Sequence, residues 1–303
     1  MHQEKSGPWL EARITREQAG RTMLELLVEE IGLPDKAARE LFRKGDVERG
    51  KETARPEDTV KAGELLRCLL FPEEPYGFEP VMWPLDVLYE DDHLIVINKE
   101  AGRKVHPNDP DETDTLLNAL AFHYQMQGLE TKVRILHRLD QETSGAILFP
   151  KHAVAQTVLD AMLAERTVSR EYRALVQGKV VQKKGLIDAP IGRDRYHATR
   201  RRVSQTGKAA QTEYEVVTRY RNATLVKARL RTGRTHQIRV HFAHLGHPLV
   251  GDELYGGSTV QFGRQALHAA LLRFPHPLTG ELLEIEAPMP DDLADLLQRL
   301  APL

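Results

Sequence analysis

The segment RILHRLDQETSGAILF, residues 134–149, contains an aspartate whose neighbours suggest more than a surface charge. Asp140 follows His137 and Arg138, and it precedes a Thr-Ser-Gly turn and an apolar strand. A carboxylate at the mouth of a strand can serve as a nucleophile or a base when it is ionised and aimed at a substrate. A surface ion pair with the adjacent arginine is the alternative, and this segment alone does not exclude it.

A second segment, LRTGRTHQIRVHFAHLGHPLVGDELY (residues 230–255), combines arginines, histidines and glycines. Gly233 lets the backbone approach a ligand closely, and Arg234 and Arg239 offer planar guanidinium groups for a carboxylate or a phosphate. This pattern favours a turn that recognises an anion. A metal site is the competing hypothesis, but the spacing matches no common zinc signature, so we expect no metal. Its candidate ligands are four histidines and one aspartate: His236, His241, His244, His247 and Asp252.

Positive charge is concentrated in one part of the chain. Residues 190–245 carry thirteen Lys+Arg against three Asp+Glu, an excess that the formal net charge of −2 hides. In TLVKARLR (residues 224–231), the two-residue period of a strand places Lys227, Arg229 and Arg231 on one face. We call these three residues the basic stripe. The stripe predicts salt-dependent contacts with the phosphates of a polyanion, and a solvated charged face is the alternative.

The elements that position these residues divide into two predicted domains. Residues 12–71 predict a small α-rich unit, with one helix in QAGRTMLELLVEEIG and another from Pro34 to Gly45. Residues 72–84 contain four prolines, which predict a linker without regular structure. Residues 85–303 predict an α+β domain with a mixed, mostly antiparallel β-sheet and flanking helices. The predicted strands lie in VLYEDDHLIVINK, SGAILFPK, REYRALVQGKV, AQTEYEVVTRY and TLVKARLR, and the predicted helices in TDTLLNALAFHYQMQG and HAVAQTVLDAMLAER.

Composition limits the class of protein. The 303 residues are 41% hydrophobic and 28% charged, as in a soluble globular protein. The single cysteine, Cys68, excludes an internal disulfide framework and a cysteine-based zinc site. No apolar run approaches the roughly 20 residues of a membrane helix, and the first residues lack the apolar core of a signal peptide. We therefore expect a cytoplasmic protein, and a monomer.

Two motifs resemble a known family. HRLDQETSG and TGRTHQIRVH…LGHPLVGDELY resemble the signature motifs of the RluA-type family of RNA pseudouridine synthases. NKEAGRKVHP, REYRALVQG, GKAAQTEYEV and LHAALLRFPHPLTGE match further family motifs in the same order, and the resemblance covers residues from about 84 to 290. Glu100 stands where the family usually has proline. The N-terminal unit resembles an S4-type RNA-binding domain, although GDVERGKE is shortened and the usual hydrophobic-Asn-Gly turn is missing.

The resemblance implies a set of catalytic residues. Asp140 is implied to act on the ribose, either by adding to C1′ or by removing a proton from C2′, and the sequence leaves both routes open. Isomerisation of uridine gains no atoms, so no cofactor is expected. Tyr172 is implied to stack on the detached uracil and to help remove the proton on C5. Arg234 is implied to be the cation that pairs with Asp140.

The remaining candidates are predicted to contact RNA. Arg138 is implied to fill the space that a flipped base leaves in its stack. A buried structural role is the open alternative for His137, and ordering of the Arg234 loop is the alternative for Gln237. The predicted RNA-binding residues are Arg138, His137, Arg239, Gln237 and the basic stripe, Lys227, Arg229 and Arg231.

The predicted function is conversion of specific uridines to pseudouridine, with large-subunit ribosomal RNA as the expected substrate. A transfer-RNA pseudouridine synthase and a non-catalytic RNA-binding ribosome-assembly factor are the alternatives. A glycoside hydrolase that uses Asp140 and Glu142 as acid and base is a further alternative, but little else in the chain resembles a sugar site.

Overall fold

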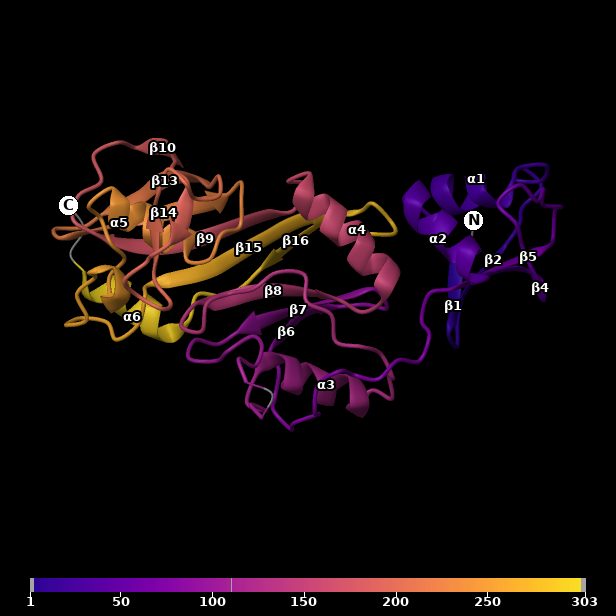
Figure 1. Cartoon of the computed structure of the whole chain (residues 1–303), viewed down its shortest axis with the longest axis horizontal. Coiled ribbons are helices and arrows are strands. Elements are labelled where there is room, and N and C mark those ends of the chain that lie inside the picture. The colour runs from indigo at the N-terminus through magenta and orange to yellow at the C-terminus, as the bar shows by residue number, and fades with distance from the viewer. Residues whose placement is uncertain (1–2, 110, 301–303) are drawn as a thin grey trace.

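The computed structural model describes residues 3–109 and 111–300, which form two lobes joined by one connecting segment (Figure 1). The last three residues of the predicted catalytic domain lie outside the described residues. The N-terminal lobe contains a five-stranded sheet in the order β1-β2-β5-β3-β4 and two helices. Its elements are β1 (Gln3–Ser6), β2 (Trp9–Arg13), α1 (Met23–Glu29), α2 (Asp35–Lys44), β3 (Val47–Arg49), β4 (Glu52–Thr53) and β5 (Leu65–Leu69).

Local signals fix both helices of the N-terminal lobe. Thr22 and Glu25 form a reciprocal capping box at the start of α1. Helix α2 begins after Pro34 and ends at Gly45, whose φ of 79° suits a residue without Cβ. Both predicted helices are therefore present. The lobe is less α-rich than predicted, because its sheet begins at Gln3, ahead of the expected boundary at residue 12.

The proline-rich segment 72–84 forms no helix or strand, as predicted. It is nevertheless anchored along the C-terminal lobe, which we call the catalytic lobe because it contains the predicted catalytic domain. The Val133 N–H donates to the Tyr76 carbonyl at 2.9 Å, and the Asn118 side-chain amide donates to the Glu79 carbonyl at 2.9 Å. Tyr76 and Phe78 also pack against the main apolar core. The segment is a strap that belongs structurally to the catalytic lobe.

The catalytic lobe is built on a nine-stranded sheet in the order β10-β13-β14-β9-β15-β8-β7-β6, with β16 paired to β15. Every pair is antiparallel except β15 with β8, which confirms the predicted α+β class with a mixed, mostly antiparallel sheet. The strands are β6 (Val87–Glu90), β7 (Leu94–Lys99), β8 (Ser144–Pro150), β9 (Ser169–Gln177), β10 (Lys184–Asp188), β13 (Gln211–Arg219), β14 (Ala223–Leu230), β15 (Leu267–Pro275) and β16 (Leu282–Glu286).

The remaining elements flank this sheet. Strands β11 (Ile191–Arg193) and β12 (Arg201–Val203) form a separate two-stranded ribbon. The helices are α3 (Leu116–Met126), α4 (Ala153–Ala164), α5 (Gln237–His244), the short 3₁₀ helix η1 (Glu253–Tyr255) and α6 (Asp291–Arg299). No helix in the described ranges is both long and apolar enough to cross a membrane.

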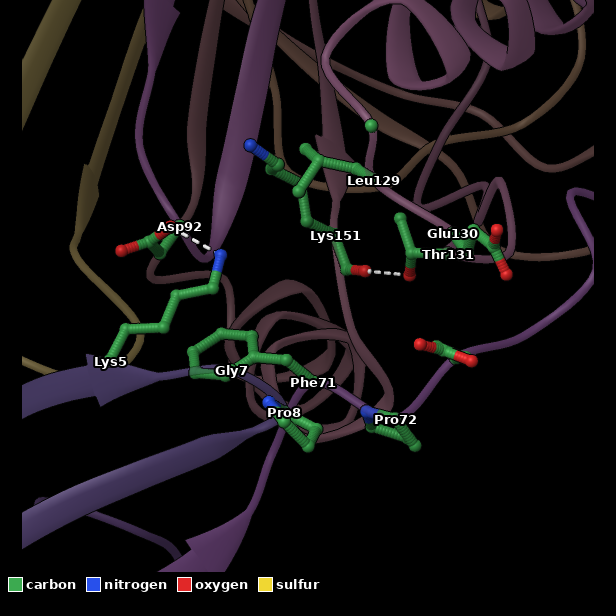
Figure 2. Close-up of a pocket in the computed structure, with 12 residues that line it drawn as sticks. Lys5, Gly7, Pro8, Phe71, Pro72, Asp92, Leu129, Glu130, Thr131 and Lys151 are labelled. Carbon is green, nitrogen blue, oxygen red and sulfur yellow. Dashed lines mark hydrogen bonds and ion pairs between the residues drawn. The ribbon is translucent and has the colours of Figure 1, made fainter.

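The N-terminal lobe packs against α4, which lies at the end of the catalytic lobe nearest to it (Figure 1). Val154 and Val158 of α4 share an apolar core with that lobe. A Cβ on Gly32 would lie 2.6 Å from the Leu278 carbonyl oxygen, so the two backbones touch there. Beside this contact is a cleft of about 290 Å³, across which Lys5 pairs with Asp92 at 2.7 Å (Figure 2).

Candidate active site

Asp140 lies in the loop that enters β8, and backbone contacts on both sides hold this loop. The Gly102 N–H donates to the Gln141 carbonyl at 3.0 Å, and Arg264 Nη1 donates to the Glu142 carbonyl at 3.1 Å. Gly145 has a φ of 111°, and a Cβ there would lie 2.2 Å from the Ala269 carbonyl oxygen of β15. The glycine of HRLDQETSG is therefore required for the parallel pairing of β8 with β15.

Lys99 ties the NKEAGRKVHP segment to the same loop. Its buried ammonium group donates to three carbonyl oxygens, those of Glu100, Arg103 and Gln141, each at 2.8 Å. Three protons meet three acceptors, so no polar hydrogen of this side chain is left unsatisfied. Sequence reasoning did not single out Lys99, although a lysine at the end of a buried strand is an unusual residue for that position.

The cation that pairs with Asp140 is Arg239, not Arg234 as predicted. Arg239 Nη1 donates to Asp140 Oδ2 at 2.9 Å. The same guanidinium binds Asp252 in a bidentate manner, with Nε to Oδ2 at 2.7 Å and Nη2 to Oδ1 at 2.9 Å. Arg239 lies on the buried face of α5, an element that the sequence analysis took for a turn. The predicted RNA contact of Arg239 is therefore replaced by a position between two carboxylates.

Arg234 lies outside this cluster. Its side chain is exposed, and its Nε donates to the Ala209 carbonyl at 3.0 Å. Gln237 holds the loop from within, because its buried carbonyl oxygen accepts from the Arg234 N–H at 3.0 Å and from the Thr232 hydroxyl at 2.8 Å. Gln237 is thus a loop-ordering residue, the alternative left open by the sequence, rather than an exposed RNA contact.

Asp140, Arg239 and Asp252 form a cluster in which one oxygen of Asp140 has no hydrogen-bond partner among the described residues. Burial opposes the charge on Arg239, but hydrogen bonds and charges from Asp252 and Asp140 raise its pKa above the ordinary value. Two carboxylates and one guanidinium have a net charge of −1. Asp140 Oδ2 accepts from Arg239, whereas Oδ1 lies 3.9 Å from His236 Nε2, beyond hydrogen-bond distance. Oδ1 is therefore the atom available to a substrate.

His236 and Tyr255 form the wall beside that oxygen. His236 caps α5 with a left-handed φ of 58°, and its Nδ1 lies 2.8 Å from the Tyr255 hydroxyl. The hydroxyl accepts from the Arg201 N–H at 2.9 Å, so its own proton points to Nδ1 and the hydrogen of the neutral imidazole is assigned to Nε2. Burial lowers the pKa of His236, which favours this neutral form.

Tyr172 lies in the apolar core beside the loop that carries Asp140. It is buried on β9, in the same core as Leu139. Burial raises the pKa of Tyr172, the charge of Arg170 opposes that rise, and the charge of Asp140 adds to it. The tyrosine therefore lies within electrostatic reach of both charged groups.

His137 and Arg138 differ sharply, although they are adjacent. Arg138 is exposed, and its Nη1 contacts His106 Nε2. His137 is buried, and its Nε2 accepts from the Leu148 N–H at 3.2 Å. Burial, assisted by the charge of Arg170, lowers the pKa of His137 to about 3. The ring is a neutral structural group that holds the loop to β8, and the predicted RNA contact of His137 is not supported by its burial.

The basic stripe faces one side of β14 as predicted, but it is not an open row of cations. Lys227 Nζ lies 3.4 Å and Arg229 Nη2 3.0 Å from the buried carboxylate of Glu171 on β9. Arg231 Nε donates to Glu213 on β13 at 2.7 Å. The sequence reading missed these acids because they lie on neighbouring strands, brought opposite the stripe by pairing.

His241 and His247, two of the histidines of the metal hypothesis, are engaged elsewhere. His241 contacts the Thr212 hydroxyl at 2.8 Å and the Ala189 carbonyl at 2.9 Å, and His247 donates to the Gln177 carbonyl at 2.9 Å. Asp252 is occupied by Arg239. Within the described residues, no group of three or more His, Cys, Asp or Glu side chains could hold a metal ion.

Comparison with known proteins identifies the reaction. The family model for RNA pseudouridylate synthase matches residues 93–244, a range that includes Asp140, Tyr172 and Arg239. The chain belongs to this family. The uncharacterized RNA pseudouridine synthase YhcT of Bacillus subtilis (strain 168) is 43% identical over 294 residues, which cover 96% of this chain and 97% of that protein.

Two further members of the family agree. The ribosomal large subunit pseudouridine synthase D of Haemophilus influenzae (strain ATCC 51907 / DSM 11121 / KW20 / Rd) is 39% identical, with 96% of this chain and 94% of that protein covered. Human RNA pseudouridylate synthase domain containing 1 superposes with a TM-score of 0.61 at 28% identity, and covers 75% of this chain and 92% of that one. The protein is thus an RNA pseudouridine synthase, an isomerase that acts on RNA.

Proposed function

We propose that this pseudouridine synthase modifies uridines of large-subunit ribosomal RNA, and that Asp140 is the group that acts on the ribose. The observation that supports the role of Asp140 is its asymmetric environment. One oxygen accepts from Arg239, while the other faces His236 at 3.9 Å and is open to a substrate. The ribosomal target is supported by the name of the similar Haemophilus influenzae protein.

The chemistry needs only one ionised carboxylate at C1′ or C2′ of the target ribose. The bond between C1′ and N1 breaks, and its electron pair leaves with the uracil. In one route the Asp140 oxygen bonds to C1′; in the other it takes the proton from C2′ and a glycal forms. The uracil then turns and C5 bonds to C1′, while the Asp140–C1′ bond breaks in the first route or the proton returns to C2′ in the second. The proton on C5 is then removed, and N1 takes up a proton. All atoms of uridine are retained, so the proposed mechanism uses no cofactor.

Tyr172 is proposed to hold the uracil while it turns. An aromatic ring at the floor of the site offers a flat, apolar surface on which a base can stack. The shared apolar core of Tyr172 and Leu139, the residue before Asp140, supports this placement. Arg239 takes the place of the predicted Arg234 as the cation that orients Asp140.

Arg138 is proposed to open the RNA. The target base must leave its stack before Asp140 can reach the sugar, and flipping a base costs a few kcal/mol. The exposed guanidinium of Arg138 lies two residues from Asp140, where it can enter the vacated space. Arg138→Ala is expected to slow single-turnover modification on stacked RNA and to lose less rate when the target uridine is already unstacked. Equal losses on the two substrates would reject the flipping role.

The N-terminal lobe, which resembles an S4-type domain in sequence, is proposed to add RNA contacts outside the active site. We also propose that the enzyme acts as a monomer. A ribosomal target requires the enzyme to share a compartment with ribosome assembly, so we propose a cytoplasmic location.

The deciding experiment maps pseudouridines in total RNA from cells with and without the gene, and after complementation with wild-type protein or Asp140→Asn. We expect at least one large-subunit site to disappear with the gene, to return with the wild-type protein and to stay absent with the variant. Sites that disappear only from transfer RNA would reject the ribosomal target. Restoration by Asp140→Asn would reject the catalytic role.

A further inference from the structure

Arg170 is a cation of the active site without a protein partner. It precedes Tyr172 by two residues on β9, so the two side chains project from the same face of the strand. In the described parts of the chain, no carboxylate or carbonyl accepts a hydrogen bond from its guanidinium group, and its Nε is buried without a partner. A buried donor without an acceptor is costly, and the outer nitrogens, Nη1 and Nη2, likewise have no protein acceptor among the described residues, so an acceptor on the substrate can bind them.

The guanidinium group of Arg170 rests on the backbone of the TGRTHQ loop. A Cβ on Gly233 would lie 3.1 Å from Nη1 and 3.4 Å from Nη2 of Arg170. The absence of a side chain at residue 233 therefore leaves room for the guanidinium between β9 and the loop that leads into α5. Gly233 precedes by four residues Gln237, the first residue of the helix that carries Arg239, so Arg170 lies beside the loop that leads into that helix.

The other arginines of the site are already engaged. Arg239 binds two carboxylates, Arg234 donates to the Ala209 carbonyl, and Arg138 contacts His106 at the surface. The charge of Arg170 nevertheless acts on the site. Burial raises the pKa of Tyr172 and lowers that of His137, and the positive charge of Arg170 lowers both.

The reaction creates an anion that this site must stabilise. When the C1′–N1 bond breaks, the uracil leaves with the electron pair and holds a negative charge spread over N1 and its carbonyl oxygens. The Asp140–Arg239–Asp252 group has a net charge of −1 before the reaction, so it offers no spare cation. In a partly buried site, a fixed positive group aimed at the developing charge lowers the barrier strongly.

We propose that Arg170 contacts the detached uracil and stabilises its negative charge while Tyr172 holds the ring. The proposal rests on the role proposed for Asp140, and it adds a second catalytic residue with a separate task. Asp140 acts on the ribose, whereas Arg170 acts on the leaving base.

The test compares two RNA substrates that carry either uridine or 5-fluorouridine at the target. Fluorine withdraws electrons and stabilises the detached uracil anion, so cleavage of the fluorinated nucleotide depends less on a nearby cation. Liquid chromatography of the nucleosides from digested RNA separates the N1-linked nucleoside from its C-linked isomer of equal mass and measures its loss in single turnover. The variants are Arg170→Gln, Arg170→Lys and Arg173→Gln; Arg173 lies on the opposite face of β9 and pairs with Glu171 at 2.7 Å, so it is the matched control.

Arg170→Gln is expected to lower the single-turnover rate on uridine RNA by roughly 100-fold, as removal of one oxyanion donor does, with little change in RNA affinity. The loss should be several-fold smaller on the fluorinated RNA. Arg170→Lys, which keeps the charge, should recover part of the rate, and Arg173→Gln should match the wild type on both substrates. If Arg170→Gln does not fold, Arg170→Lys carries the same comparison between substrates.

Three results would overturn the proposal. Equal fractional losses on the two RNAs would mean that Arg170 only supports the loop at Gly233. A loss of affinity with an unchanged rate would mean that it binds an RNA phosphate instead. No loss on either RNA would mean that it has no part in the reaction. Failure of the role proposed for Asp140 is seen separately, as turnover by Asp140→Asn on uridine RNA.

Discussion

Two carboxylates of the catalytic lobe, Asp140 and Glu171, both pair with arginine, yet their surroundings are opposite. Glu171 is the centre of its cluster, with Arg173 at 2.7 Å, Arg229 at 3.0 Å and Lys227 at 3.4 Å from its oxygens. In the other cluster the cation is central. Arg239 lies between Asp140 and Asp252, and Asp140 is an outer member with one oxygen open.

This difference separates a structural acid from the acid that we propose as catalytic. Cations saturate both oxygens of Glu171, so they cannot reach a substrate without breaking an ion pair. One oxygen of Asp140 pairs with the guanidinium group of Arg239, and the other is open to a substrate, as a nucleophile or base requires. Glu171 and Tyr172 are consecutive in β9, so Glu171 and its cations lie on the opposite face of the strand from Tyr172.

The strongest way to test this contrast is to neutralise each acid without changing its shape. Asp140→Asn should lower the rate of pseudouridine formation by at least about 10⁴-fold, because the reacting carboxylate is removed. RNA affinity should persist, since most of it comes from phosphate contacts. Tritium release from C5-labelled uridine RNA measures the rate, and filter binding measures the affinity. Appreciable turnover by the Asn variant would remove Asp140 from the mechanism.

The next largest effect is expected from the central cation. Arg239→Gln leaves Asp140 and the buried Asp252 without their charged partner, so the free energy of unfolding should fall by about 3–5 kcal/mol. Activity should be lost as well. In the double variant Arg239→Gln/Asp252→Asn, stability should largely return because the buried charge is gone, but activity should not. Urea denaturation and tritium release measure the two quantities. A double variant no more stable than the single one would contradict the central position of Arg239.

The acid at the centre of the other cluster should affect stability alone. Burial alone would raise the pKa of Glu171, but hydrogen bonds from Arg229 and Arg173 and the charge of Lys227 lower it overall. Glu171→Gln should therefore cost about 1–3 kcal/mol at pH 7, with single-turnover activity unchanged. A lowered folded-state pKa stabilises above the unfolded value near 4.5, and this contribution is lost as the pH falls through the folded-state value.

The pH dependence is measured as the difference in unfolding free energy between wild type and Glu171→Gln. That difference should be largest at neutral pH and shrink below about pH 4.5. A difference that grows toward low pH would have the wrong sign for an ion-paired carboxylate. Loss of catalytic rate in this variant would erase the proposed distinction between the two clusters.

The sequence predicted the strands well because their period is local. The alternation in TLVKARLR correctly separated the faces of β14, and the capped ends at Pro34 and Gly45 located α2. Helix α5 was missed, because its N-cap is His236 in a left-handed conformation without a side-chain cap, and its apolar pattern is interrupted by arginine and histidine. In this segment, the residue pattern of a turn cannot be told from that of a short buried helix.

The missed helix explains the wrong choice between Arg234 and Arg239. On a turn, the exposed arginine after Gly233 is the natural partner for an acid. On α5, Arg239 is carried inward to meet Asp140, 99 residues earlier in the chain, and Asp252, 13 residues later. Contacts between segments so far apart depend on tertiary packing, which no local pattern encodes. The GDELY segment supplies Asp252 and Tyr255, but its resemblance to the family implied no role for Tyr255, and Asp252 was considered only as a metal ligand.

The smallest effect should come from the basic stripe, whose cations face acids on neighbouring strands. An open row of three cations on phosphates would contribute roughly 0.7–0.9 units each to the slope of log affinity against log salt. Lys227 and Arg229 already pair with Glu171, and Arg231 with Glu213, so a phosphate must compete with a carboxylate for each one. Replacing all three by Gln should therefore reduce the slope by less than about one unit in total.

The same replacements in a Glu171→Gln/Glu213→Gln background should reduce the slope more, because that background frees the cations for RNA. The measurement is RNA affinity over a range of salt concentrations for the four proteins. A loss of two units or more in the otherwise wild-type chain would show that the stripe binds phosphate directly despite its ion pairs, and it would weaken the assignment of Glu171 as a saturated structural acid.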